Sequence, residues 1–190
     1  MLIEWDPRHL YRKIFPTEEE VTWFLENICT SEWNDHQDAG RSFGEATEEL
    51  IGRFPQHELP IRAWYDRWKE TIRGPVPGTV DLLRSIRESR KYKLYALTNW
   101  SAETFPWALE NFEFLHWFDG IVVSGVEKTR KPFPGFYKIL LDRYSVSPDT
   151  TLFIDDNLKN VEGAKAVGIS TIHFRSPQQL AEELKKRNIP

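Results

Sequence analysis

The sequence of 190 residues lacks the features that define several large classes of protein. It holds one cysteine, Cys29, so no disulfide can form within the chain, which is typical of a reducing, cytoplasmic location. Lys and Arg total 25 against 29 Asp and Glu, a net charge of −4, and the scattered basic residues give no footprint for nucleic acid. No apolar run is long enough to span a bilayer, and the N-terminus has no signal-peptide pattern. We therefore expect neither nucleic acid nor a membrane as a partner.

Glycine-rich nucleotide-binding motifs are also missing. Neither the dinucleotide-binding Gly-x-Gly-x-x-Gly pattern nor a P-loop occurs anywhere in the chain. What is present is ordinary for a folded globular protein, with 40 % hydrophobic and 28 % charged residues. The length is sufficient for one core with a small second unit.

The first part of the chain, residues 6–74, carries helical patterns and no convincing strand. Thr17 and Glu20 form a capping-box pattern that predicts the start of a helix. Apolar and aromatic residues at helical spacing predict another helix over residues 59–72. The glycines and prolines of residues 74–78 then break the chain, and we place a domain boundary there.

After this break, short apolar segments alternate with amphipathic helices. Strands are predicted over residues 94–97, 121–123, 152–154 and 171–174. A parallel sheet covered on both faces requires this alternation. The expected fold class is therefore α/β, a Rossmann-like three-layer α/β/α sheet over residues 75–190 with an inserted all-helical unit over residues 6–74. The aromatic residues between 105 and 118 are predicted to be core.

Polar side chains follow the predicted strands. Thr98 and Asn99 end the first strand, Asp155 and Asp156 end the third, and Lys131 lies in the loop after the second. Ligands of such sheets bind at this carboxyl edge, and adjacent carboxylates suit Mg²⁺. A hydroxyl, an ammonium group and paired carboxylates together predict a Mg²⁺–phosphate site.

Each of these residues also has a purely structural interpretation. One of the two aspartates can cap the helix that begins near Asn157. Thr98 can simply end a strand, and Lys131 can be a solvated loop lysine. The functional hypothesis is favoured because the fold would gather all of them at one edge.

The order of these motifs resembles the haloacid dehalogenase-like (HAD) hydrolase superfamily, in its phosphatase-like branch with a small helical cap. The second motif of that family is similar to residues 94–99, the third to Lys131 and Pro132, and the fourth to residues 152–156 and their continuation to 164. The resemblance covers essentially the whole chain. It implies Mg²⁺-dependent hydrolysis of a small phosphorylated metabolite through an aspartyl-phosphate intermediate.

The resemblance also implies a role for each residue of the site. Thr98 and the Asn99 backbone amide would bind the phosphoryl group, and Lys131 would offset its charge. Asp156 would ligate Mg²⁺ directly, Asp155 would do so directly or through a water molecule, and Asn160 would support the metal site.

One part of the family pattern is missing. Family members begin with an apolar strand that ends in the nucleophilic aspartate. This chain starts with Met1, as though cut just past that residue, so residues 1–5 are interpreted as a remnant of the first strand. Neither Asp6 nor Asp35 can substitute, because both lie on the cap side. We hypothesise a misplaced start. If the chain instead begins at Met1, we expect either another segment in the place of the strand or low stability.

The cap would select the substrate, which the sequence does not name, although a sugar phosphate is one possibility. Candidate specificity residues lie in the cap and just after the Thr98 motif: Trp5, Trp33, His36, Asp38, Arg41 and Trp100. Each tryptophan has packing between helices as its alternative role, and His36 has a surface position as its alternative. We expect a monomer or a homodimer.

Two alternative functions stay open. A metal-independent 2-haloacid dehalogenase is disfavoured by the Asp155–Asp156 pair, because that branch resembles Ser-Ser-Asn-x-x-Asp at this motif. A catalytically inactive chain that keeps the fold and binds phosphate is favoured by the missing nucleophile.

Overall fold

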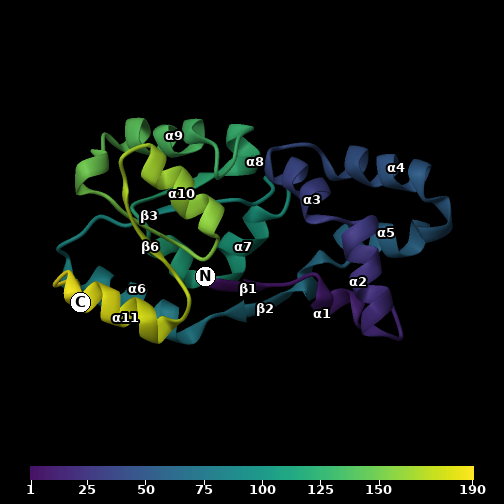
Figure 1. Ribbon diagram of the computed structural model, residues 1–190, viewed down its shortest axis with the longest axis horizontal. Coiled ribbons are helices and arrows are strands. Elements are labelled where there is room, and N and C mark those ends of the chain that lie inside the picture. The colour runs from purple at the N-terminus through teal and green to yellow at the C-terminus, as the bar shows by residue number, and fades with distance from the viewer.

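The computed structural model describes residues 1–190, and it contains a helical region beside an α/β region (Figure 1). We call residues 6–74 the cap region, and these bounds remain a prediction. Its helices are α1 (Arg8–Tyr11), α2 (Glu18–Asn27), α3 (Ser31–Asp38), α4 (Phe43–Arg53) and α5 (Glu58–Asp66), with 3-10 turns η1 (Pro55–His57) and η2 (Trp68–Thr71). No helix of the protein is long and apolar enough to cross a membrane.

The cap region has its own hydrophobic core, which includes Tyr11, Phe24, Trp33 and Trp64. The predicted capping box opens α2, where Thr17 Oγ1 accepts a hydrogen bond from the Glu20 backbone amide at 3.2 Å. The start of α2 is therefore determined by the local sequence, and packing in the cap-region core holds the helix in place.

The prediction of one helix over residues 59–72 is wrong at its end. Helix α5 stops at Asp66, and Ile72–Pro75 form strand β2, which pairs antiparallel with β1 (Ile3–Trp5). The glycine and proline of this segment predicted a break in the chain, but a two-stranded edge pair tolerates both. Strands β1 and β2 form the connection between the cap region and the rest of the chain (Figure 1).

The four strands predicted after residue 74 are confirmed as β3 (Tyr95–Thr98), β4 (Gly120–Val123), β5 (Leu152–Asp155) and β6 (Ser170–His173). They form two parallel pairs, β3 with β4 and β5 with β6. The helices between and around them are α6 (Pro77–Ser89), α7 (Phe105–Asn111), α8 (Ser124–Glu127), α9 (Pro134–Tyr144), α10 (Leu158–Ala166) and α11 (Pro177–Lys186), with 3-10 turns η3 (Glu113–Trp117) and η4 (Pro148–Thr150).

Helices cover both faces of these strands, as the α/β class requires. Consecutive residues of β4 point to opposite faces: Val122 packs with α9 and α10, and Val123 packs with α6 and α7. The aromatic residues predicted as core pack on the same face as Val123, α6 and α7, where Phe105, Phe112 and Phe114 are buried.

No strand among residues 1–190 lies between β3 and β5. Both strands contribute to the wall of a cavity of about 1390 Å³ that extends from this gap to the cap region. Residues 3–5 do not fill the gap, because they pair with β2. Of the two expected outcomes, another segment in the place of the strand is therefore not observed, and low stability stays a prediction.

Candidate active site

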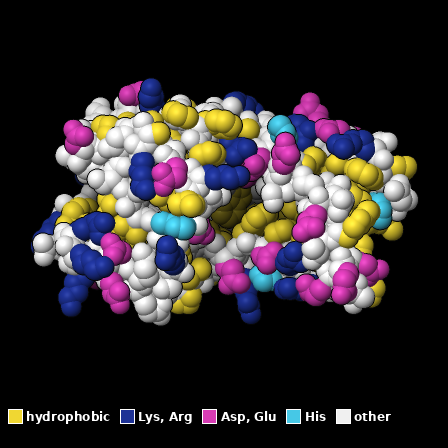
Figure 2. Space-filling view, in the orientation of Figure 1, with side chains coloured by type: hydrophobic (Ala, Val, Ile, Leu, Met, Phe, Trp, Pro, Cys, Tyr) yellow, Lys and Arg dark blue, Asp and Glu magenta, His cyan; other side chains and the backbone are white.

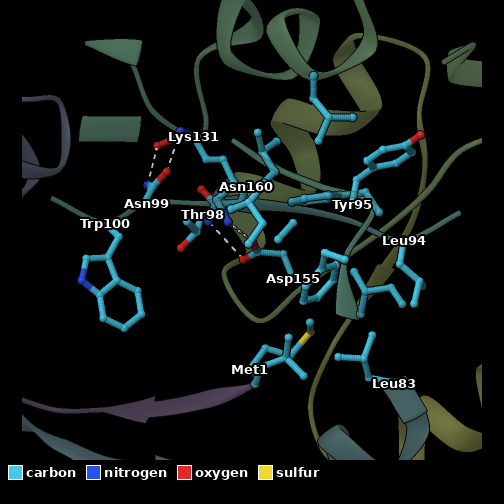
Figure 3. A pocket seen from close by; sticks show the side chains of 18 of the residues that line it. Met1, Leu83, Leu94, Tyr95, Thr98, Asn99, Trp100, Lys131, Asp155 and Asn160 are labelled. Carbon is cyan, nitrogen blue, oxygen red and sulfur yellow. Dashed lines mark hydrogen bonds and ion pairs between the residues drawn. The ribbon is translucent and has the colours of Figure 1, made fainter. Parts of the chain in front are cut away.

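A buried ion pair joins the ends of two segments that are far apart in the sequence. Lys131 Nζ lies 2.7 Å from Asp155 Oδ2, and the two residues are 8 % and 5 % exposed. Asp155 is the last residue of β5, so the pair lies at the carboxyl edge of the strands (Figure 3). Lys131 is therefore not the solvated loop lysine of the structural interpretation.

Asn99 holds the Lys131 loop against the end of β3. Its side-chain carbonyl accepts a hydrogen bond from the Lys131 backbone amide at 2.9 Å, and its amide group donates to the Lys131 carbonyl at 3.0 Å (Figure 3). Thr98, the last residue of β3, lines the cavity next to this contact. The three residues predicted to bind phosphate are thus adjacent.

Asp155 is oriented by groups of the following loop and helix. Its Oδ1 atom accepts hydrogen bonds from the Asn157 backbone amide at 2.8 Å and from Asn160 Nδ2 at 3.0 Å. Asn157, rather than either aspartate, caps α10 through its own side chain. The interpretation of one aspartate as that helix cap is therefore wrong.

Asp156 faces a positive charge. Its Oδ2 atom lies 3.1 Å from the Met1 amino group. Burial opposes ionisation of Asp156, but the Met1 ammonium group outweighs it by charge and hydrogen bonding, and the pKa of Asp156 is lowered. The Asp156 carboxylate also lines the cavity, next to Asp155.

The carboxylate oxygens at this site are donors of the kind that Mg²⁺ prefers. No group of three or more His, Cys, Asp or Glu side chains in the chain is arranged to hold a metal ion. Asp155 and Asp156 nevertheless supply hard oxygen donors, and Mg²⁺ is commonly held by one or two carboxylates together with water and phosphate.

The candidate specificity residues divide into two groups. Trp5, Asp38 and Trp100 line the cavity. The others lie outside its lining: Trp33 is buried in the cap core, His36 is exposed, and Arg41 contacts Gln37 and Glu49. Figure 2 shows the hollow between the α/β region and the cap region, with hydrophobic side chains inside it.

Sequence reasoning missed much of the cap-side wall. These lining residues are Asn34, Phe43, Trp64, Tyr65 and Trp68. The aromatic stripe of α5 was visible in the sequence, but a helical stripe alone does not separate residues that face a core from residues that face a cavity.

The sequence model of a family described as haloacid dehalogenase-like hydrolase matches residues 16–174. The chain therefore belongs to the haloacid dehalogenase-like hydrolase family, and the resemblance drawn from its motifs is confirmed.

Several curated relatives are phosphatases. The sesquiterpene phosphatase astK of Aspergillus oryzae is 34 % identical over 112 residues, which cover 59 % of this chain and 57 % of that protein. The phosphorylated carbohydrates phosphatase of Thermotoga maritima is 28 % identical over 62 % of this chain and 51 % of its own length. The chain thus spans little more than half the length of these relatives.

Solved structures show the same fold. The HAD family enzyme BT-2542 of Bacteroides thetaiotaomicron, in a magnesium complex, superposes with a TM-score of 0.73 at 19 % identity and covers 97 % of this chain and 93 % of its own. An L-2-haloacid dehalogenase of Xanthobacter autotrophicus gives a TM-score of 0.62, also at 19 % identity, over 98 % and 80 % of the chains. The predicted α/β fold class is confirmed.

Proposed function

We propose that the protein is a Mg²⁺-dependent phosphomonoester hydrolase that acts on a small phosphorylated substrate through an aspartyl-phosphate intermediate. The observation that carries this proposal is the buried pair of Lys131 Nζ and Asp155 Oδ2, 2.7 Å apart at the carboxyl edge of β5. Phosphoryl transfer depends mainly on positioning and on charge stabilisation, and a fixed ammonium group beside a carboxylate pair supplies both. The phosphatases among the relatives support this reaction class over dehalogenation.

Each residue of the site has a role in this proposal. Lys131 offsets the negative charge of the phosphoryl group, while the Thr98 hydroxyl and the Asn99 backbone amide donate hydrogen bonds to it. Asp155 and Asp156 would hold Mg²⁺, which when bound would neutralise phosphate charge, and Asn160 keeps Asp155 oriented.

The nucleophilic aspartate is assigned to none of residues 1–190. The acids in the cavity lining are Asp38, Asp149, Asp155 and Asp156. Asp155 and Asp156 are assigned to the metal, Asp149 precedes β5 and so lies toward its amino end, and Asp38 belongs to the cap region. The mechanism therefore needs an extended strand that ends in aspartate and fits the gap between β3 and β5.

The contact between Asn99 and the Lys131 loop favours a second candidate function for residues 1–190 taken alone. This function is phosphate binding without turnover. The Lys131 loop and the end of β3 are in contact without any strand between β3 and β5. The phosphate-binding groups can therefore be present when the nucleophile is not.

One experiment tests the proposed function and separates the two candidates. Inorganic phosphate binding with Mg²⁺ is measured by calorimetry, and phosphate release is assayed over a panel of phosphomonoesters. Residues 1–190 are compared with a form that carries an added N-terminal apolar strand ending in aspartate. We expect both forms to bind phosphate and only the extended form to release it.

Matched variants make the outcome specific. The extended form with asparagine in place of the added aspartate should bind phosphate without turnover, and Lys131→Ala should abolish binding in both forms. Failure of both forms to bind phosphate would refute the proposal. Chloride release from a 2-chloro acid without Mg²⁺ would establish the dehalogenase reaction instead.

A further inference from the structure

The cap-side wall of the cavity combines aromatic rings with two polar side chains from one helix. Phe43 and Tyr65 stack with ring centroids 3.7 Å apart, and both line the cavity. Asn34 and Asp38 line it from α3, where their spacing of four residues puts them on the same helix face. An aromatic surface with few polar groups is the usual composition of a small-molecule site.

Asp38 has no hydrogen-bond partner in the protein, and it is half-buried in the cavity wall. The basic groups near it are occupied elsewhere: Arg130 Nη2 lies 2.7 Å from Asp35 Oδ2, and Lys131 pairs with Asp155. The buried Tyr65 hydroxyl is also close, yet it makes no hydrogen bond of normal geometry. The carboxylate of Asp38 thus keeps its accepting capacity free for a group in the cavity.

The position of Asp38 does not stabilise the fold. It is the last residue of α3, and a carboxylate at the C-terminal end of a helix is opposed by the helix dipole. Burial raises its pKa to about 7, and the charge of Asp35 adds to this, while Arg130 and Lys131 act in the opposite direction. A half-buried carboxylate without a protein partner is satisfied by water or by a ligand in the cavity.

We propose that Asp38, together with Asn34, recognises a hydroxyl group on the leaving group of the substrate, and that the Phe43 and Tyr65 rings pack on its apolar body. The substrate class is then a phosphomonoester with an aromatic or hydrocarbon body that carries a second hydroxyl group away from the phosphate. This inference rests on the proposed function, because the Lys131 site holds the phosphate end. The Asp38 carboxylate accepts a hydrogen bond from the hydroxyl group, and the Asn34 side-chain amide donates one to the hydroxyl oxygen.

The test uses two phosphomonoesters that differ by one hydroxyl group, 4-(hydroxymethyl)benzyl phosphate and 4-methylbenzyl phosphate. Their affinities for residues 1–190 with Mg²⁺ are measured by calorimetry, with inorganic phosphate as the reference. At about pH 8, where the Asp38 carboxylate is mostly ionised, we expect the hydroxylated ester to bind about tenfold more tightly, because an ionised acceptor in the cavity wall rejects a ligand that leaves it unpaired. Asp38→Asn should bring the ratio of the two ester affinities close to one, and Phe43→Ala should weaken the binding of both esters equally.

Controls separate recognition from a structural role. Glu19, an exposed acid of α2, provides the matched variant Glu19→Gln, which should keep the tenfold ratio. The melting temperature of Asp38→Asn should equal or exceed that of the unmodified protein, whereas a structural carboxylate would lower it. Equal affinity for the two esters in the unmodified protein would overturn this inference alone. Absence of phosphate and ester binding altogether would overturn the proposed function, and this inference with it.

Discussion

Lys131 Nζ and Asp155 Oδ2 lie 2.7 Å apart although the two residues are 24 positions apart in the chain, and both side chains are buried. The contact joins the loop after α8 to the end of β5, so it exists only when the strands on both sides of the gap are correctly placed. The same two groups serve the fold and the proposed chemistry, and variants at this pair report on both.

Lys131→Met should destabilise the protein by about 3 kcal/mol, since it leaves the Asp155 carboxylate buried without its partner. Unfolding in urea, followed by circular dichroism, measures the change. Lys165→Met is the matched control, because its ion pair with Glu162 is exposed and should contribute less than about 1 kcal/mol. Equal effects of the two variants would contradict the importance of the buried pair.

Gly163→Ala should move α10 away from the Lys131 loop. A Cβ atom at Gly163 would lie 2.5 Å from the Pro132 carbonyl oxygen, so the backbone has to shift, at a cost of about 1 to 3 kcal/mol. Gly52→Ala in α4 has open space and should stabilise the protein by up to about 1 kcal/mol. The two thermal melts are compared directly, and a stabilised Gly163→Ala variant would show that this close approach is unimportant.

Stability should fall as the pH rises from about 4 to about 7, in part because of Asp38. Its pKa is raised to about 7 in the folded protein, mainly by burial and then by Asp35, so the folded state binds its proton more tightly than the unfolded state does. The stabilising contribution of Asp38 is complete below its pKa in the unfolded chain, about 4, and it is lost as the pH rises to its pKa in the folded protein, about 7. Asp38→Asn should therefore gain roughly 2 to 3 kcal/mol relative to the unmodified protein between pH 5 and pH 7.5. A difference in unfolding free energy that does not change with pH would contradict this assignment.

Backbone amides of β3 and β5 should exchange quickly with deuterium where they face the gap. Alternate amides of a strand point to opposite edges, and each of these strands has a partner on one edge only. A peptide of about seven residues, apolar and ending in aspartate, should slow this exchange by adding a strand. The same peptide with a central proline is the control, and equal protection by both peptides would argue against strand addition.

The motifs and most elements of the α/β region could be predicted from the sequence because they depend on local patterns. Apolar segments of strand length predicted β3 to β6, and the Thr17 and Glu20 pattern predicted the start of α2. Pairing between distant segments has no such local signal. For this reason the strand at residues 72–75 was missed, and its antiparallel partner in β1 could not be named.

What the sequence by itself determined is therefore the chemistry at the strand ends: which residues follow each strand, and the family to which their order belongs. Only the tertiary structure decided which of these residues meet. It paired Lys131 with Asp155, brought Asp38 to the cavity wall without a partner, and left the edges of β3 and β5 unpaired. The physical reason is that burial, hydrogen-bond geometry and charge compensation depend on neighbours in space, and the chain pattern encodes these only through the completed fold.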